Sequence, residues 1–233
     1  MTGTHDGRAL IFDLDGTLID LEPISVKSIG AVIADHGGEY TLRHHKMILG
    51  RARAQWTRVL VDEIGLHDRI TPHDLGEKAE AKLKESYHEA AVLPGVIELL
   101  KKMKAKGIPM AIGTSSGQDA VAAKRTHHPE LFSFFDIVVC GDDKDVKFGK
   151  PAPDIFVTAG RRLLGDDFDA SKCVVFEDSP NGVAAARAAG MKVMALPDGR
   201  FYTEDEEKAH KFSEADEILS SILAFDETKY GFQ

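Results

Sequence analysis

Two aspartates separated by one residue, Asp13 and Asp15, follow a short apolar run near the start of the chain. Gly16 comes next and lets the backbone turn sharply. In an open α/β sheet, ligands bind beyond the carboxyl ends of the strands, where two such carboxylates would point into the ligand crevice. For an Asp-x-Asp tripeptide alone, a turn that caps a helix is the favoured interpretation. The other strand ends decide between the two interpretations.

Polar groups also gather at three later points of the chain. Thr114 and Ser115, in a GTSSG segment, offer hydroxyls and free backbone N–H groups that suit phosphate oxygens at a helix N-terminus. Lys150 stands in a GKPAPD segment, just ahead of a predicted helix. A second acidic pair, Glu177 and Asp178, ends another apolar run. Each feature alone has a structural explanation, but their convergence on one crevice favours a functional site.

The elements that must position these residues alternate along the chain. Short β-rich apolar runs are separated by segments of helix length, and the runs are Ala9–Leu14, Ile108–Gly113, Ile137–Cys140, Cys173–Asp178 and Lys192–Leu196. Strands of this composition are buried on both faces, which requires a parallel sheet covered by helices. The predicted fold class is therefore α/β, with a doubly wound, Rossmann-like parallel sheet as its core.

One long segment departs from this alternation. Residues 20–91 have a helical pattern throughout, with Leu75, Ala79 and Leu83 recurring at every fourth position. A simple crossover between parallel strands needs only about a dozen residues or somewhat more. We therefore expect a separate helical domain at 20–91, inserted into a core domain made of residues 1–19 and 92–233.

Composition excludes several classes of protein. The chain has 233 residues and a net charge of −9, which argues against binding to nucleic acid or to an anionic membrane. Its two cysteines, Cys140 and Cys173, are too few for a disulfide framework or a four-cysteine zinc site. Neither a membrane-spanning run nor the apolar core of a signal peptide is evident. We expect a cytoplasmic protein, with a monomer favoured.

The motifs DLDGTL, TSSG, GKPAPD and FEDSPNGVAAARAAG resemble the four motifs of the haloacid dehalogenase-like (HAD) phosphatases, in the same order and over nearly the whole chain. Within this superfamily the sequence is most similar to the helical-cap subgroup and its pseudouridine-5′-phosphatase branch. That branch shades into phosphatases of sugar phosphates and glycerol phosphate. The resemblance implies hydrolysis of a small phosphorylated metabolite, such as a nucleoside monophosphate (pseudouridine 5′-phosphate) or a sugar or polyol phosphate.

The resemblance also implies a role for each strand-end residue. Asp13 would attack the phosphorus and form an aspartyl-phosphate. Asp15 would protonate the leaving alkoxide and then take a proton from the hydrolytic water. Thr114 and Lys150 would hold the phosphoryl oxygens, with Ser115 beside them.

Mg²⁺ is the cofactor that the resemblance implies, since this ion prefers oxygen ligands. Its ligands would be a carboxylate oxygen of Asp13, the backbone carbonyl of Asp15 and the carboxylate of Asp178. Glu177 would bind the ion either directly or through water. The ion would allow an anionic nucleophile to approach an anionic substrate.

Other members of the superfamily can be weighed against these residues. Asp15 argues against true haloacid dehalogenases, which lack the second aspartate, and against phosphonatases, which carry a small residue there. Membrane P-type ATPases need transmembrane helices that the sequence lacks. A phosphomutase related to β-phosphoglucomutase keeps every motif residue and stays open as the alternative. A catalytically silent ligand-binding relative is disfavoured, because a binder has no need of both Asp13 and Asp15.

By the same resemblance, the helical insert is a cap that closes over the site, excludes water and contacts the substrate. Arg51, at a predicted helix start, is its candidate substrate-binding cation, and a solvated arginine is the structural alternative. Trp56 is expected in the core because its spacing matches an apolar stripe. His44 and His45 lack partners at the spacing of metal ligands and are expected on the surface.

Overall fold

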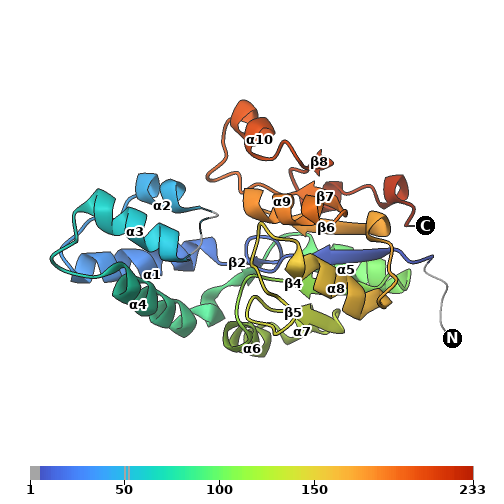
Figure 1. Cartoon of the computed structure of the whole chain (residues 1–233), viewed down its shortest axis with the longest axis horizontal. Helices are drawn as coiled ribbons and strands as arrows, with labels where there is room; N and C mark the ends of the chain where they lie inside the picture. The colour runs from blue at the N-terminus through green and yellow to red at the C-terminus, as the bar shows by residue number, and fades with distance from the viewer. Residues whose placement is uncertain (1–5, 50, 52, 233) are drawn as a thin grey trace. The chain divides into compact units, whose positions relative to one another are not determined.

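The structure, a computed structural model, describes residues 6–49, 51 and 53–232. The chain forms two compact units. The first contains the residues up to Asp20 and those from Val92 onward, and the second contains Leu21–Ala91. Figure 1 labels the helices and strands along the chain.

A six-stranded parallel sheet forms the centre of the first unit, in the order β5-β4-β1-β6-β7-β8. Its strands are β1 (Ala9–Phe12), β4 (Met110–Gly113), β5 (Ile137–Val139), β6 (Cys173–Glu177), β7 (Lys192–Ala195) and β8 (Glu217–Ile218). With helices on its faces, this sheet confirms the predicted α/β fold class. The apolar runs predict every strand except β8, which has only two residues and no such run.

Helices of the first unit alternate with the strands, and 3₁₀ turns precede β6 and follow β8. The helices are α5 (Val96–Ala105), α6 (Gln118–His127), α7 (Pro129–Phe132), α8 (Asp154–Leu164), α9 (Pro180–Ala188) and α10 (Asp205–Lys211), and the 3₁₀ turns are η2 (Ala170–Lys172), η3 (Ile222–Ala224) and η4 (Glu227–Tyr230). The start of α9 shows how local sequence sets a boundary. Ser179 is its N-cap and accepts a hydrogen bond from the Gly182 N–H at 3.1 Å, while Pro180 occupies the first turn.

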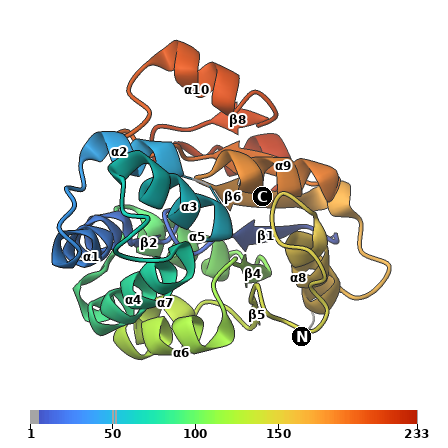
Figure 2. The ribbon, with the colours of Figure 1, turned by 60° about the vertical axis from the view of Figure 1, so that its left-hand side comes forward.

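The two faces of the sheet are covered differently because strand side chains alternate in direction. Ala9 and Ile11 of β1 join a buried cluster with residues of α8 and α9. These two helices pack beside each other against the sheet (Figure 2). On the other face, Phe12 stacks on Phe176 of β6, with ring centroids 4.8 Å apart. The apolar side chains of β1 and β6 are therefore buried on both faces of the sheet, and the acidic residues lie at the ends of these strands.

Four α-helices make up most of the described part of the second unit. They are α1 (Glu22–Asp35), α2 (Leu42–Ile48), α3 (Arg53–Ile64) and α4 (Pro72–Glu85), followed by the 3₁₀ turn η1 (Tyr87–Glu89). Their apolar faces meet in a cluster that includes Val32, Leu60 and Leu75. Two-residue strands, β2 (Ile19–Asp20) and β3 (Ala91–Val92), stand in the sequence where the chain enters and leaves this unit. None of the helices in the described part of the chain is long and apolar enough to span a membrane.

Candidate active site

The carboxyl ends of β1 and β6 bring two acidic segments together. Phe12 is paired with Phe176, and the Asp13 N–H donates to the Phe176 carbonyl at 2.9 Å, which continues the ladder by one residue. The chain then turns at Gly16, whose φ is 90°. A Cβ at this glycine would lie 2.3 Å from an Asp178 carboxylate oxygen. Gly16 is therefore required both by its backbone angle and by the close approach of Asp178.

Lys150 bridges the two strand ends. Its Nζ donates to Asp13 Oδ1 and to Glu177 Oε1, at 2.5 Å in each case. The side chains of Lys150, Asp13 and Glu177 are 6%, 8% and 1% exposed. The ammonium also lies 4.6 Å from the centre of the Phe156 ring of α8. Three charges are thus held out of water by mutual pairing, which is the condition under which charged groups can be buried.

The second oxygen of Glu177 is also engaged. Glu177 Oε2 accepts from the backbone N–H of Ser179 at 2.9 Å and from its hydroxyl at 3.0 Å. Gly182 of α9 packs so closely that a Cβ there would fall 1.8 Å from the Glu177 carboxylate. Glu177 is therefore fixed on both sides, and it orients the ammonium of Lys150.

Burial and charge shift the pKa values of this cluster. Burial raises the pKa of Asp13, Lys150 lowers it, and the nearby charges of Glu177 and Asp15 raise it further, to about 7 in all. For Lys150, burial opposes the charged form, but the carboxylates of Asp13 and Glu177 outweigh it and raise the pKa above its ordinary value. Lys150 is therefore a permanent cation, and Asp13 is the group whose charge depends on its surroundings.

Asp15 belongs to a second network, which the sequence analysis missed. Lys124 of α6 donates from Nζ to both carboxylate oxygens of Asp15, at 2.7 and 2.6 Å. The Ser116 hydroxyl donates to Asp15 Oδ2 at 2.6 Å. Lys124 is buried, and its neighbours Ala120 and Val121 on α6 are buried as well. The sequence could have indicated the burial of Lys124, because a lysine placed one turn after two apolar residues lies on the inner face of a helix.

The segment after β4 places the two predicted hydroxyl residues differently. Thr114 is buried; its N–H donates to the Val139 carbonyl at 3.0 Å and its Oγ1 accepts from the Ser116 N–H at 3.1 Å. Ser115 is exposed. Gly141 packs closely against its backbone, since a Cβ on Gly141 would lie 2.4 Å from the Ser115 carbonyl oxygen. The buried hydroxyl of Thr114 thus orders the turn, while Ser115 presents its side chain to solvent.

Asp178 completes the set of strand-end carboxylates. The Thr17 hydroxyl lies 3.5 Å from Asp178 Oδ1, across the turn that begins at Gly16. The structure therefore brings Asp13, Lys150 and Glu177 into direct contact and places Asp178 against the turn that carries Asp15. All of these groups lie in the first unit.

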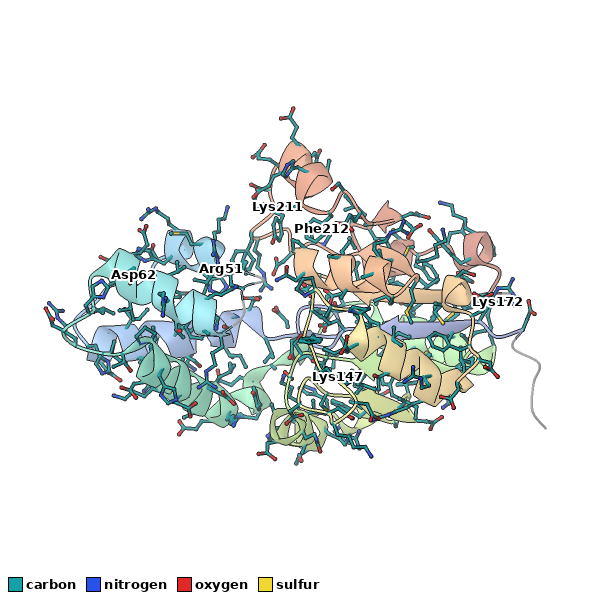
Figure 3. All side chains as sticks on the ribbon, in the orientation of Figure 1. Arg51, Asp62, Lys147, Lys172, Lys211 and Phe212 are labelled. Atoms are coloured by element: carbon teal, nitrogen blue, oxygen red, sulfur yellow. The ribbon has the colours of Figure 1, made fainter. Side chains whose placement is uncertain are left out.

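Arg51 lies in the second unit, between α2 and α3 (Figure 3). It is exposed, and its Nε donates to the Met47 carbonyl at 2.7 Å. The neighbouring residues Gly50 and Ala52 lie outside the described residues. The contact to Met47 is thus local to this unit.

The second unit contains a cavity of about 280 Å³, bordered by Glu22, His45 and Trp56 among others. Trp56 is half-buried and packs against the helical core, as its spacing predicts. The surface position expected for His45 is wrong, because its side chain is only 2% exposed. Its Nε2 lies 2.6 Å from Glu22 Oε2 and its Nδ1 lies 2.7 Å from the Tyr40 hydroxyl. Burial is possible because both ring nitrogens have partners.

Paired carboxylates and a buried lysine lie at the carboxyl end of the parallel sheet, as the resemblance to the haloacid dehalogenase-like phosphatases leads us to expect. A model of the haloacid dehalogenase-like hydrolase family matches residues 8–190. The chain belongs to this family, which confirms the predicted family.

Individual relatives cover nearly the full chain. It is 36% identical to the probable pseudouridine-5′-phosphatase of Drosophila melanogaster, over 95% of this chain and 92% of that protein. It is 34% identical to (DL)-glycerol-3-phosphatase 2 of Arabidopsis thaliana, over 95% of this chain and 90% of that protein. A HAD family hydrolase from Deinococcus radiodurans, solved with bound phosphate and sodium, has a TM-score of 0.73 and 26% identity over 96% of each chain. The curated relatives are phosphatases by name, which supports the predicted enzyme class, a HAD-type phosphatase.

Proposed function

We propose that the protein is a Mg²⁺-dependent phosphomonoesterase that hydrolyses a small phosphorylated metabolite through an aspartyl-phosphate at Asp13. The observation that carries the proposal is the pairing of Asp13 with the buried Lys150 at the end of β1. The substrate is a nucleoside monophosphate, such as pseudouridine 5′-phosphate, or a sugar or polyol phosphate. The names of the two curated relatives cited above support the nucleoside monophosphate and the polyol phosphate.

In the first half-reaction, a carboxylate oxygen of Asp13 attacks the phosphorus of the monoester. The bond from phosphorus to the alcohol oxygen breaks, and Asp15 gives its proton to the departing oxygen. Lys150 offsets the negative charge that moves onto the phosphoryl oxygens, because its pKa keeps it charged. Thr114, buried at the end of β4, helps to hold the same oxygens, with Ser115 beside it.

In the second half-reaction, water attacks the phosphorus of the aspartyl-phosphate. Asp15, now ionised, takes a proton from that water, and the bond from phosphorus to the Asp13 oxygen breaks. Inorganic phosphate leaves, and Asp13 is regenerated as a carboxylate while Asp15 carries the proton again. The contacts of Lys124 and Ser116 with Asp15 fit the ionised form that this step requires.

The donor groups at the strand ends fit Mg²⁺. Among the described residues, no three His, Cys, Asp or Glu side chains stand together as an ion site, and we propose a set that combines side chains with backbone and water. The carboxylates of Asp13 and Asp178 and the carbonyl of Asp15 form such an oxygen set. Glu177 has both oxygens engaged, and we propose that it acts on the ion through water and through Lys150. When bound, the ion supplies positive charge that lets two anions meet.

We further propose that the second unit, residues 20–91 by the sequence analysis, is a cap that supplies substrate contacts. The cavity bordered by Glu22 and Trp56 lies entirely within this unit and supports a binding role. Arg51 remains its candidate cation, because its side chain is exposed.

Phosphate release from a panel of phosphorylated metabolites tests the proposal. The wild-type chain should release phosphate only with Mg²⁺ present, and chelation should abolish the activity reversibly. Asp13→Asn should lower turnover by at least about 10³-fold, whereas Asp205→Asn, at a fully exposed aspartate (100%), should leave turnover unchanged. Acid-quenched wild-type enzyme should carry one phosphoryl group on the Asp13 peptide.

Two results would contradict the assignment. Metal-dependent release that persists in Asp13→Asn would remove Asp13 as the nucleophile. Conversion of a hexose phosphate into its isomer without release of phosphate would instead assign a phosphomutase.

A further inference from the structure

We propose that Lys124 is a positioning residue that holds the carboxylate of Asp15 in the orientation needed for proton transfer. The proposal rests on the function proposed above, because it concerns the acid and base of that reaction. It adds a residue of α6, outside every motif that the sequence analysis identified.

The contacts form a closed triangle. Lys124 Nζ lies 2.7 Å from Asp15 Oδ1, 2.6 Å from Oδ2 and 2.9 Å from the Ser116 hydroxyl oxygen. The Ser116 hydroxyl in turn donates to Asp15 Oδ2 at 2.6 Å. Since every edge of the triangle is a hydrogen bond, the carboxylate cannot rotate about its last bond without losing at least one of them.

The two oxygens of Asp15 differ in this arrangement. Oδ2 accepts from both Lys124 and Ser116, so its two lone pairs are occupied. Oδ1 accepts from Lys124 only among the described residues, so one lone pair is left to exchange a proton. The geometry therefore assigns Oδ1 as the oxygen that serves the leaving group and the hydrolytic water.

Burial argues that this lysine is more than a surface charge. The Lys124 side chain is 1% exposed, whereas that of Asp15 is 25% exposed. A lysine on a helix usually extends its flexible stem until the ammonium reaches water. Keeping it inside costs free energy unless it is paired, and an apolar residue would fill the same place on the inner face of α6 more cheaply. The buried lysine contacts the carboxylate of Asp15, which must be oriented for proton transfer in the proposed reaction.

Lys124 also keeps the two aspartates in separate networks. Lys150 contacts Asp13 and Glu177, while Lys124 contacts Asp15. Each aspartate is therefore paired with a different ammonium.

Leaving groups of different basicity provide a test that a merely structural role would not satisfy. p-Nitrophenolate departs without a proton, whereas an alkoxide needs one, so only alkyl phosphates need the acid in the first half-reaction. Both substrates need the base in the second. In Lys124→Met, p-nitrophenyl phosphate should give a normal first-turnover burst of one equivalent followed by slow turnover. The alkyl phosphate that wild type hydrolyses fastest should give no burst, with turnover about 10²-fold lower.

Two more variants keep the test informative. Ser116→Ala removes one donor to Asp15 and should show the same dependence on the leaving group, with a smaller loss of turnover. This variant still tests the proposal if Lys124→Met proves unstable. Lys101→Met is the matched control, because Lys101 is 62% exposed in a surface pair with Glu130 and should show wild-type kinetics. Thermal unfolding of each variant establishes that the folded fraction is unchanged.

Asp15→Ala separates the two levels of the proposal. The expected pattern is a burst with p-nitrophenyl phosphate and no burst with the alkyl phosphate. Suppose that Asp15→Ala shows this pattern but that Lys124→Met and Ser116→Ala do not, because they lose burst and turnover equally on both substrates or lose neither. The proposed role of Lys124 is then overturned. If Asp15→Ala itself fails to show the pattern, or wild type hydrolyses neither substrate, the function proposed above fails, and the role of Lys124 with it. If Asp15→Ala shows the pattern and Lys124→Met or Ser116→Ala shows it too, the result supports both the proposed function and the role of Lys124.

Discussion

Glu177 and Lys150 form a buried ion pair, with Oε1 and Nζ 2.5 Å apart and side chains that are 1% and 6% exposed. The other oxygen of Glu177 is held by Ser179 at the start of α9. The lysine that faces Asp13 is therefore fixed by a residue of the neighbouring strand. This supports a role for Glu177 in placing the charge of Lys150, with Asp178, the residue after β6, as the proposed metal ligand.

Substitution of the two neighbouring acids should separate these roles. Asp178→Asn removes a proposed ligand and should raise the Mg²⁺ concentration for half-maximal activity by at least about 10-fold. Glu177→Gln keeps the shape of the side chain but loses its charge, so it should lower turnover while moving the Mg²⁺ requirement by less than about threefold. Titration of activity with Mg²⁺ measures both quantities. An equal rise in the Mg²⁺ requirement in the two variants would mean that Glu177 is itself a ligand.

Gly16 should tolerate no side chain. Gly16→Ala places a methyl group 2.3 Å from Asp178 Oδ2 at a φ of 90°. We expect a loss of about 1–3 kcal/mol in the free energy of unfolding, together with loss of activity as Asp178 is displaced. Gly199→Ala is the matched control, because no atom lies within 4 Å of its added Cβ. Urea unfolding measures the difference; equal stability of the two variants would show that the turn can adapt.

Much of the fold could be predicted because buried parallel strands are nearly uniform in composition. β1 is apolar along its whole length and β6 is apolar up to its last residue, Glu177, so each apolar run ends where the acids begin. β8 could not be found in this way, since Glu217–Ile218 forms a two-residue edge strand beside β7. Its pairing depends on the rest of the sheet being in place, which no local pattern records.

The site was predictable where side-chain chemistry and position coincide, as for Asp13 and Lys150. The helix periodicity indicates an inner position for Lys124, but the partners of Lys124 and His45 could not be predicted, because these residue types are usually solvated. Each is buried only because a carboxylate distant in the sequence meets it: Asp15 for the lysine and Glu22 for the histidine. A sequence pattern reports the periodicity of one helix, whereas such partners depend on tertiary contacts.

His45 should be a stability residue of the second unit. His45→Ala leaves Glu22 and Tyr40 without their buried partner and should lower the free energy of unfolding by about 1–3 kcal/mol. His73→Ala, at a histidine whose side chain is 81% exposed, should change it by less than about 0.5 kcal/mol. Thermal and urea unfolding give both values. If His45→Ala were as stable as His73→Ala, the hydrogen bonds of His45 would contribute nothing net.

Glu227 should make the stability of the first unit depend on pH. Hydrogen bonding to Lys102, 2.6 Å away, lowers the pKa of Glu227 from its ordinary value of 4.5 to about 2. Because the folded-state pKa is the lower one, the stabilisation is fully present above about pH 4.5 and is lost as pH falls toward 2. Glu227→Gln should therefore be less stable than wild type at neutral pH, and the gap should narrow progressively in acid.

Urea unfolding of wild type, Glu227→Gln and the control Glu214→Gln at neutral pH and near pH 3 measures this gap. Glu214 is exposed on the surface, so its variant should follow wild type at both pH values. Comparison with the control cancels the titration of the other carboxylates, which contributes to the acid sensitivity of all three proteins. A gap between wild type and Glu227→Gln that stayed constant with pH would show that Glu227 stabilises the fold by packing, since a packing contribution does not titrate.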